Sequence, residues 1–263
     1  MIKDSYQTKQ RLISTNQESN HLDSNADQQP TQDYNRSSIN ASQAPQKPRG
    51  FNLIKYLDLQ DRKLSRCIHQ AELPHFEYLI VAFGTIFNRL YCFIPIFITC
   101  ALAAQQPEKL TILMTNHSQK YASKLEENGG NKLSLSLFWL IFNTFLLLIL
   151  LFTTQTLKRL IRRNRPSALR VARKINLTDI EKGTLSMPSG DTAQAALWCG
   201  LMNLFFQSQT VMFMVPLVAL GRIYYQCHYI GDTLAGGMIG FFIANLGFVH
   251  FDRIASFIFP MVI

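Results

Sequence analysis

Residues 135–157 read LSLFWLIFNTFLLLILLFTTQTL and contain no charged side chain. A transmembrane helix needs about 20 predominantly apolar residues to cross the hydrocarbon core of a bilayer. This stretch meets that requirement better than any other part of the chain. It predicts a membrane-spanning helix and, with the apolar stretches on either side of it, an all-α membrane protein.

The apolar stretch before it, residues 77–104, is interrupted by Asn88 and Arg89 and contains Pro95. It is too short for two crossings, so we expect one long helix with a kink near the proline. Asn88 and Arg89 could contact a ligand, but the preferred interpretation is a polar pair facing the bundle or a short break in the helix.

Several shorter apolar stretches follow the clearest span. Gly236 and Gly240 form a pair of small residues that allows two helices to approach closely. The last stretch, 254–263, is too short to span and is expected at the membrane interface. Together these stretches predict a polytopic helix bundle with about five to six transmembrane helices, the later ones at 192–207, 210–227 and 233–250.

The N-terminal part of the chain differs in composition from the rest. The whole chain is 48% hydrophobic with a net charge of +9, but residues 1–48 are rich in Gln, Asn, Ser and Asp. Such a segment cannot bury enough apolar surface to become ordered, which predicts a disordered polar tail. Residues 49–76 are expected to hold an amphipathic helix on the membrane surface or against the bundle, and residues 77–263 a membrane domain.

The connection after the clearest span is strongly basic. It holds eight Lys or Arg residues between Lys158 and Lys174, with no acidic residue among them. Most of these cations are interpreted as a membrane flank or as lipid-headgroup contacts. This interpretation covers Arg159, Arg162, Arg163, Arg170, Arg173 and Lys174.

Three short blocks stand out from this background. The first is Lys158 followed after six residues by Arg165–Pro166, and the second is Pro188–Ser189–Gly190–Asp191 at the start of an apolar stretch. In the third block, five residues separate Arg222 from His228 and three separate His228 from Asp232. The first block follows one predicted helix, the second precedes the next, and the third follows the helix after that. Alternating crossings should therefore place all three blocks at the same membrane face.

Each block suits the handling of a phosphoryl group. Fixed cations and amide donors stabilise the charge on its oxygens, and the backbone N–H groups at a helix N-terminus favour an anion. His228 and Asp232 are four residues apart, which predicts that they share one face of a helix. A carboxylate placed there can hold the imidazole in one tautomer.

The three blocks resemble the signature of the type 2 phosphatidic acid phosphatase (PAP2) superfamily, KxxxxxxRP, PSGH and SRxxxxxHxxxD. The resemblance implies a PAP2-type membrane bundle in which His228 attacks phosphorus and Asp232 orients it. It implies that no metal or other cofactor is needed. The phosphate-binding residues would be Lys158, Arg165, Ser189, Gly190 and Arg222.

Two residues depart from the signature. Asp191 replaces the histidine that normally protonates the leaving oxygen, and Gly221 replaces a serine. An ordinary aspartate is ionised at neutral pH, so Asp191 would act as an acid only with a raised pKa. Otherwise it would repel the phosphate, be neutralised by a nearby cation, or serve only as a helix N-terminal carboxylate.

The sequence therefore predicts a metal-independent lipid phosphate phosphatase that works through a phosphohistidine. The alternative is a catalytically impaired relative that binds phospholipid headgroups or membrane partners. Phosphatidate, lysophosphatidate, a sphingoid phosphate and a polyprenyl mono- or diphosphate all remain candidate substrates. The expected partners are membrane lipids and not nucleic acid, the expected location is an endomembrane such as the endoplasmic reticulum, and no oligomeric state is predicted.

Overall fold

The computed structural model describes residues 53–88, 91–105, 132–167 and 185–262. Within these residues every regular element is a helix, so the predicted all-α class is confirmed. The predicted tail, residues 1–48, lies outside the described residues. The elements in chain order are α2 (Leu53–His69), α3 (Glu77–Thr85), α4 (Phe93–Gln105), α7 (Lys132–Ile161), α8 (Gly190–Phe206), the 3-10 helix η2 (Gln209–Phe213), α9 (Met214–Tyr224), α10 (Ile230–Val249) and α11 (Phe251–Val262).

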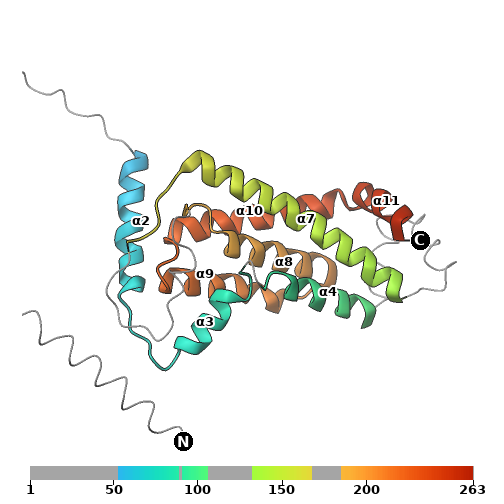
Figure 1. Cartoon of the computed structure of the whole chain (residues 1–263), viewed down its shortest axis with the longest axis horizontal. Coiled ribbons are helices and arrows are strands. Elements are labelled where there is room, and N and C mark those ends of the chain that lie inside the picture. The colour runs from blue at the N-terminus through green and yellow to red at the C-terminus, as the bar shows by residue number, and fades with distance from the viewer. Residues whose placement is uncertain (1–52, 89–90, 106–131, 168–184, 263) are drawn as a thin grey trace, which may run out of the picture. The chain divides into compact units, whose positions relative to one another are not determined.

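Two of these helices are long and apolar enough to cross a membrane. They are Leu133–Ile161, with a mean hydropathy of 2.5, and Ile230–Val249, with a mean hydropathy of 1.4. In Figure 1, α7, α8 and α10 run lengthwise, while α2 lies across one end of them. Both long helices expose large apolar side chains, as a lipid-facing surface requires; these include Leu148, Phe152, Leu234, Met238 and Phe242.

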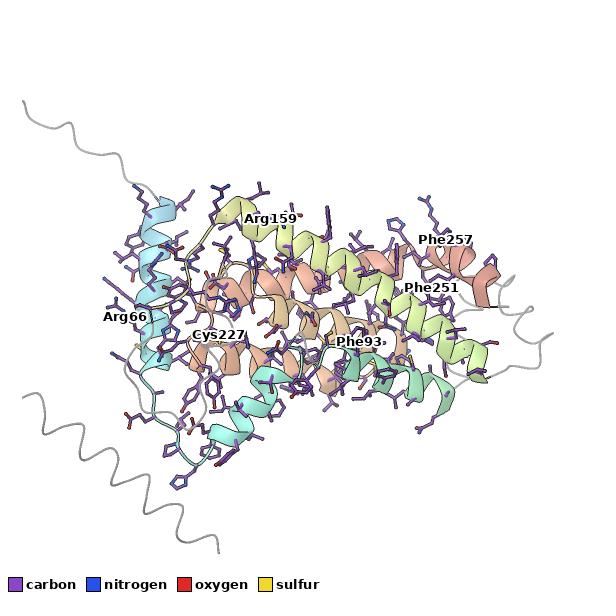
Figure 2. The ribbon with its side chains drawn as sticks, in the orientation of Figure 1. Arg66, Phe93, Arg159, Cys227, Phe251 and Phe257 are labelled. Carbon is purple, nitrogen blue, oxygen red and sulfur yellow. The ribbon has the colours of Figure 1, made fainter. Side chains whose placement is uncertain are left out.

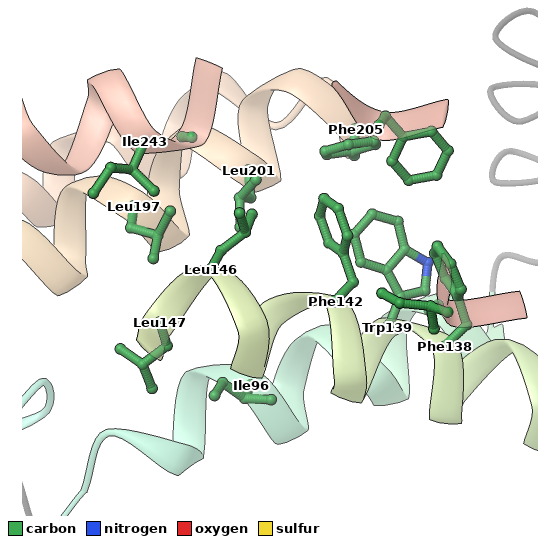
Figure 3. Close-up of a cluster of buried hydrophobic side chains, with 14 of the residues drawn as sticks. Ile96, Phe138, Trp139, Phe142, Leu146, Leu147, Leu197, Leu201, Phe205 and Ile243 are labelled. Atoms are coloured by element: carbon green, nitrogen blue, oxygen red, sulfur yellow. The ribbon is translucent and has the colours of Figure 1, made fainter. Parts of the chain in front are cut away.

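The core of the bundle is built largely from aromatic rings far from α2. Trp139 of α7 is fully buried, and its ring lies 4.9 Å from that of Phe205 in a T-shaped arrangement. Phe251 of α11 packs edge-on against Phe142 at 5.5 Å. Figure 3 shows these rings continuing into an aliphatic layer of leucine and isoleucine side chains. This cluster joins α4, α7, α8, α10 and α11.

Helices α8 and α10 touch through their backbones. A Cβ added at Gly236 would overlap the carbonyl oxygen of Ser189, and one added at Gly240 would overlap that of Ala193. These glycines therefore permit a separation that any side chain would widen. The small-residue prediction for this pair is confirmed, and the contact brings the first turn of α8 against α10.

The prediction of one helix over residues 77–104 is wrong. Helix α3 ends at Thr85, and α4 begins at Phe93. Between them the backbone turns, since the Asn88 amide donates to the Thr85 carbonyl at 2.8 Å and the Tyr91 amide donates to the Asn88 carbonyl at 2.8 Å. The polar break thus separates two helices with different partners, because α3 packs against α9 and α4 packs against α7.

The two ends of the described chain also add detail to the sequence prediction. Residues predicted as an amphipathic helix form α2, which packs against α9 and α10. The apolar stretch near the C-terminus is a helix that starts at Phe251 and buries Phe251, Ala255 and Ile258 in the core.

Candidate functional site

The three sequence blocks meet at the end of the bundle where α2 lies. The Arg165 side chain, just past α7, donates from Nη1 to the Cys227 carbonyl at 2.7 Å. The Ser189 amide, at the start of α8, donates to the Asp232 carbonyl at 2.9 Å. Figure 2 places Cys227 between α2 and the ends of α9 and α10. The helix order predicted this convergence, and the structure brings the segments into direct contact.

His228 lies in the turn before α10 and not on the helix, so the prediction that it shares a helical face with Asp232 is wrong. Its side chain is buried, with 2% exposed. Nδ1 is 3.7 Å from Asp232 Oδ2, longer than a hydrogen bond, and Nε2 is 3.5 Å from Arg165 Nη1. The ring therefore stands between a carboxylate and a guanidinium.

Burial lowers the pKa of His228 to about 4, and the neighbouring Arg222 and Arg165 cations act in the same direction while Asp232 opposes them. The imidazole is consequently neutral at neutral pH. A neutral imidazole keeps a lone pair on one nitrogen, which a nucleophile requires.

Asp232 is fully buried, and both of its oxygens are engaged. Oδ2 accepts from the Tyr229 amide at 2.9 Å, and Oδ1 accepts from Arg163 Nη1 at 2.6 Å. The second contact also makes a buried ion pair. Asp232 is therefore held from two sides, with Oδ2 still directed toward His228.

Arg163 was assigned to the membrane flank, and that interpretation is wrong. Its side chain is only 9% exposed and pairs with Asp58 at 2.6 Å and Asp61 at 2.7 Å as well as with Asp232. Its guanidinium carbon also lies 4.3 Å from the centre of the Tyr229 ring. The sequence carried one signal for this cluster. Asp58 and Asp61 are three residues apart, which places them on one side of a predicted helix. They can balance the charge of the basic segment, which has no acidic residue of its own.

Ser189 and Gly190 begin α8. The Ser189 side chain caps the helix, accepting from the Thr192 amide at 3.4 Å, and shares a 3.0 Å hydrogen bond with the Thr192 hydroxyl. A Cβ added at Gly190 would meet nothing within 4 Å. Open space therefore lies at Gly190, at a helix N-terminus where the amide groups and the helix dipole favour an anion.

Asp191 forms an ion pair with Arg222, whose Nε lies 3.0 Å from Asp191 Oδ2. The Arg222 side chain is only 1% exposed, and its Nη1 also donates to the Gly84 carbonyl at 3.3 Å. One candidate phosphate ligand is thus already bound to a carboxylate. Of the outcomes considered for an ionised Asp191, neutralisation by a nearby cation is the one that the structure contains.

Helix α3 accounts for the glycine at position 221. A Cβ added at Gly221 would lie 2.9 Å from the Cα and the amide nitrogen of Gly84. A serine there would push α3 away from α9, because the two backbones are in contact. The missing hydroxyl is therefore a consequence of the helix packing.

The remaining basic residues fall into two groups. Lys158 is half-buried in the last turn of α7, while Arg159 and Arg162 are exposed, as expected for a membrane flank. Arg170, Arg173 and Lys174 lie outside the described residues. Within the described ranges, no group of three or more His, Cys, Asp or Glu side chains is arranged to hold a metal ion.

Residues 137–254 match the family model of the PAP2 superfamily. This part of the chain therefore resembles that superfamily. The PAP2 region contains α8, α9, α10 and every candidate residue of the three blocks, whereas α2 with Asp58 and Asp61 lies outside it. The chain is accordingly an all-α membrane helix bundle of the PAP2 type.

Two solved structures resemble the chain at low identity. One is the first transmembrane PAP2 type phosphatidylglycerolphosphate phosphatase from Bacillus subtilis, with a TM-score of 0.48, 15% identity, and coverage of 78% of this chain and 88% of that one. The other is LpxE of Aquifex aeolicus, with a TM-score of 0.38, 18% identity, and coverage of 70% and 92%. At these scores neither structure bears on the chemistry of this chain. No curated protein matches the sequence.

Proposed function

We propose that this PAP2 protein is a metal-independent phosphatase of a membrane lipid phosphate. The observation that carries the proposal is the placement of His228. A neutral, buried imidazole lies beside a fixed carboxylate on one side and Arg165 on the other. The open N-terminus of α8 begins with Ser189, whose amide bonds to the Asp232 backbone.

The proposed reaction has two steps. Nε2 of His228 attacks phosphorus, a P–N bond forms, and the bond from phosphorus to the lipid oxygen breaks. Nε2 is the attacking atom because Nδ1 faces Asp232, which stabilises the Nδ1 proton as positive charge develops on the ring. Water then attacks the phosphohistidine, releasing inorganic phosphate and restoring the imidazole.

The charge on the phosphoryl oxygens would be stabilised by Lys158, Arg165 and Arg222 together with the amide groups at Ser189 and Gly190. Arg222 can offer its Nε to phosphate only if phosphate displaces Asp191, because the carboxylate already pairs with that atom. The leaving oxygen needs a proton, and Asp191 is the candidate acid near Arg222. With a lipid diphosphate the bond from the terminal phosphorus to the bridging oxygen breaks, and the leaving group is a lipid monophosphate. Such a leaving group depends least on this proton, so a diphosphate substrate favours turnover with this site.

The substrate and the location are finer parts of the same proposal. A site at the end of a membrane bundle suits an amphiphile whose tail stays in lipid, such as phosphatidate, lysophosphatidate, a sphingoid phosphate or a polyprenyl (di)phosphate. We propose a multi-pass protein of an endomembrane, with α4 and the α9 segment adding to the two long helices.

The test is phosphate release by purified protein in detergent from these lipid phosphates, with a chelator present. His228→Ala should abolish release, whereas His250→Ala, an exposed histidine after α10, should leave it unchanged. Label from the substrate should also appear on the wild-type protein in an acid-labile, alkali-stable linkage. Release that persists in His228→Ala would overturn the histidine mechanism.

The Asp191–Arg222 ion pair favours a second candidate, a headgroup-binding protein with impaired chemistry. This protein would bind vesicles that contain phosphatidate without releasing phosphate. Flotation of the purified protein with such vesicles, compared with phosphatidylcholine vesicles, tests the binding. Phosphate release from any lipid in the panel would favour the enzyme instead.

A further inference from the structure

Helix α2 presents its polar side to the bundle. Ser65 and His69 are buried, and Asp61 is half-buried, all on the side that faces α9 and α10. The leucines of α2 point the other way, since Leu53 and Leu64 are more than half exposed. Figure 2 likewise shows Arg66 on the outer side of α2. Ile68 of α2 adds one apolar contact, with the cluster around Ile80 and Tyr224, but most of the contact between α2 and the bundle is made by hydrogen bonds and ion pairs.

These polar side chains bind the backbone at the start of α10. The Ile230 amide donates to Ser65 Oγ at 2.9 Å, and the Gly231 amide donates to Asp61 Oδ1 at 2.9 Å. The first amides of a helix have no backbone partner within that helix, so α2 supplies acceptors for two of these amides, in addition to the bond between the Tyr229 amide and Asp232. A Cβ at Gly231 would lie 2.7 Å from Asp61 Oδ2, and only glycine lets the carboxylate come this close.

A further contact reaches the turn that carries the proposed nucleophile. His69 Nε2 lies 3.2 Å from the His228 carbonyl oxygen and is placed to donate to it. Gln226 in the same turn has a left-handed backbone with φ of 56°, and its Nε2 donates to the His69 carbonyl at 3.5 Å. The turn from Gln226 to Gly231 is thus held by α2 along its length.

Arg163 joins these contacts to Asp232. One of its terminal nitrogens, Nη2, pairs with Asp58 and Asp61 of α2, and the other, Nη1, binds Asp232 Oδ1. The bond at Oδ1 leaves Oδ2 directed toward the Tyr229 amide and the His228 ring. The fork of a guanidinium can connect two helices in this way, whereas an ammonium group acts as a single point of charge.

We propose that Arg163 is a positioning residue for the His228–Asp232 pair, and that α2 acts through Arg163 and its own backbone contacts as a clamp on the turn 226–231. The proposal rests on the proposed phosphatase function for its effect on rate. Whether α2 holds this turn can be measured by hydrogen exchange, without any enzymatic turnover. Since Asp58 and Asp61 lie outside the PAP2 region, this part of the site is supplied by the segment that precedes it.

The first test is kinetic. Arg163→Ala should lower kcat by about 10- to 100-fold, as loss of a supporting side chain around a reactive group commonly does, with KM nearly unchanged because Arg163 does not touch the substrate. Arg163→Lys should recover only part of this loss, because it cannot span both helices. Arg159→Ala, an exposed arginine in the same basic segment, is the matched control and should stay within twofold of wild type.

The second test is hydrogen exchange of the peptide covering residues 226–233 in detergent. Exchange should be at least tenfold faster in Ser65→Ala and Arg163→Ala, while peptides from the aromatic core of α7 stay unchanged. Asp58→Asn removes only one of the ion pairs of Arg163, the one with the half-exposed Asp58. It gives the same readout with a smaller increase if Arg163→Ala does not fold.

Unchanged exchange in these variants would overturn the clamp. A kcat for Arg163→Ala equal to that of Arg159→Ala would overturn the positioning role. If the wild-type protein releases no phosphate from any lipid, the proposed function fails and the exchange experiment alone decides whether α2 holds the turn.

Discussion

Two buried arginine–carboxylate pairs lie in the same candidate site, and they have opposite consequences for it. In the Arg163–Asp232 pair, the arginine is bound by acids of α2 and the carboxylate keeps an oxygen directed to His228. In the Arg222–Asp191 pair, the carboxylate occupies an arginine that the PAP2 resemblance assigns to phosphate. The first pair supports the proposed chemistry, and the second competes with the substrate.

The difference comes from which partner the rest of the protein holds. Asp232 is fully buried, and removing one partner of such a pair leaves an uncompensated charge that typically costs about 3–5 kcal/mol. Asp191 is 14% exposed and lies at the first turn of α8, next to open space at Gly190. An incoming anion can therefore exchange with Asp191 at Arg222, but nothing that enters the site can replace Asp232.

The largest effect is expected from breaking the supporting pair. Asp232→Asn keeps the size of the side chain but removes the charge that orients His228, and it should lower kcat by about 10³- to 10⁴-fold, as the same change does in other carboxylate–histidine pairs. The measurement is single-turnover phosphate release from the preferred lipid. A loss smaller than tenfold would show that Asp232 serves the fold and not the chemistry.

The separation of the two pairs depends on α8 and α10, which carry Asp191 and Asp232 respectively. Gly240→Ala should lower the free energy of unfolding by about 3 kcal/mol, because its Cβ would overlap the Ala193 carbonyl. Gly237→Ala, one turn away with nothing within 4 Å of its Cβ, is the control and should be neutral or stabilising by up to about 1 kcal/mol. Denaturant unfolding in mixed micelles measures both, and equal stabilities would contradict the observed contact.

The neutral state of His228 predicts a pH dependence that separates it from both ion pairs. The folded protein binds this proton only near pH 4, whereas the unfolded chain binds it near pH 6.5. The contribution of neutral His228 to the free energy of unfolding is therefore fully present above about pH 6.5 and is lost as the pH falls toward 4. Between pH 7 and pH 5 the free energy of unfolding should fall by about 2 kcal/mol. His228→Gln should lose this slope in the same unfolding experiment, and an unchanged slope would assign it to other groups.

The smallest effect is expected at the competing pair. Asp191→Asn should bind inorganic phosphate about tenfold more tightly, about 1.4 kcal/mol, because the anion no longer has to displace a carboxylate from Arg222. Phosphate inhibition of lipid hydrolysis measures this, and Glu72→Gln, an exposed acid past α2, controls for net charge. If kcat instead falls by about 10²- to 10⁴-fold without tighter phosphate binding, Asp191 is the acid and not a competitor.

The sequence predicted what depends on short spacing and on helix order. The PAP2 blocks, the span at α7 and the glycine contact of α10 were all visible as local patterns. Arg163 was not, because its acidic partner Asp61 is 102 residues away and no short pattern links them. The break between α3 and α4 was underestimated because apolar composition continues across it, and the position of His228 was misread because α10 starts only at Ile230.

The glycines of α10 have a consequence for motion. Since Gly236 lies against the Ser189 carbonyl and the Ser189 amide bonds to Asp232, the spacing between the anion-favouring end of α8 and the Asp232 backbone is set by main chain against main chain. This distance does not depend on side-chain rotamers, which interchange thermally. We therefore expect the two ends to move as one body, so that any opening that admits a bulky substrate comes from the neighbours of this pair, which include α7, α9 and α2.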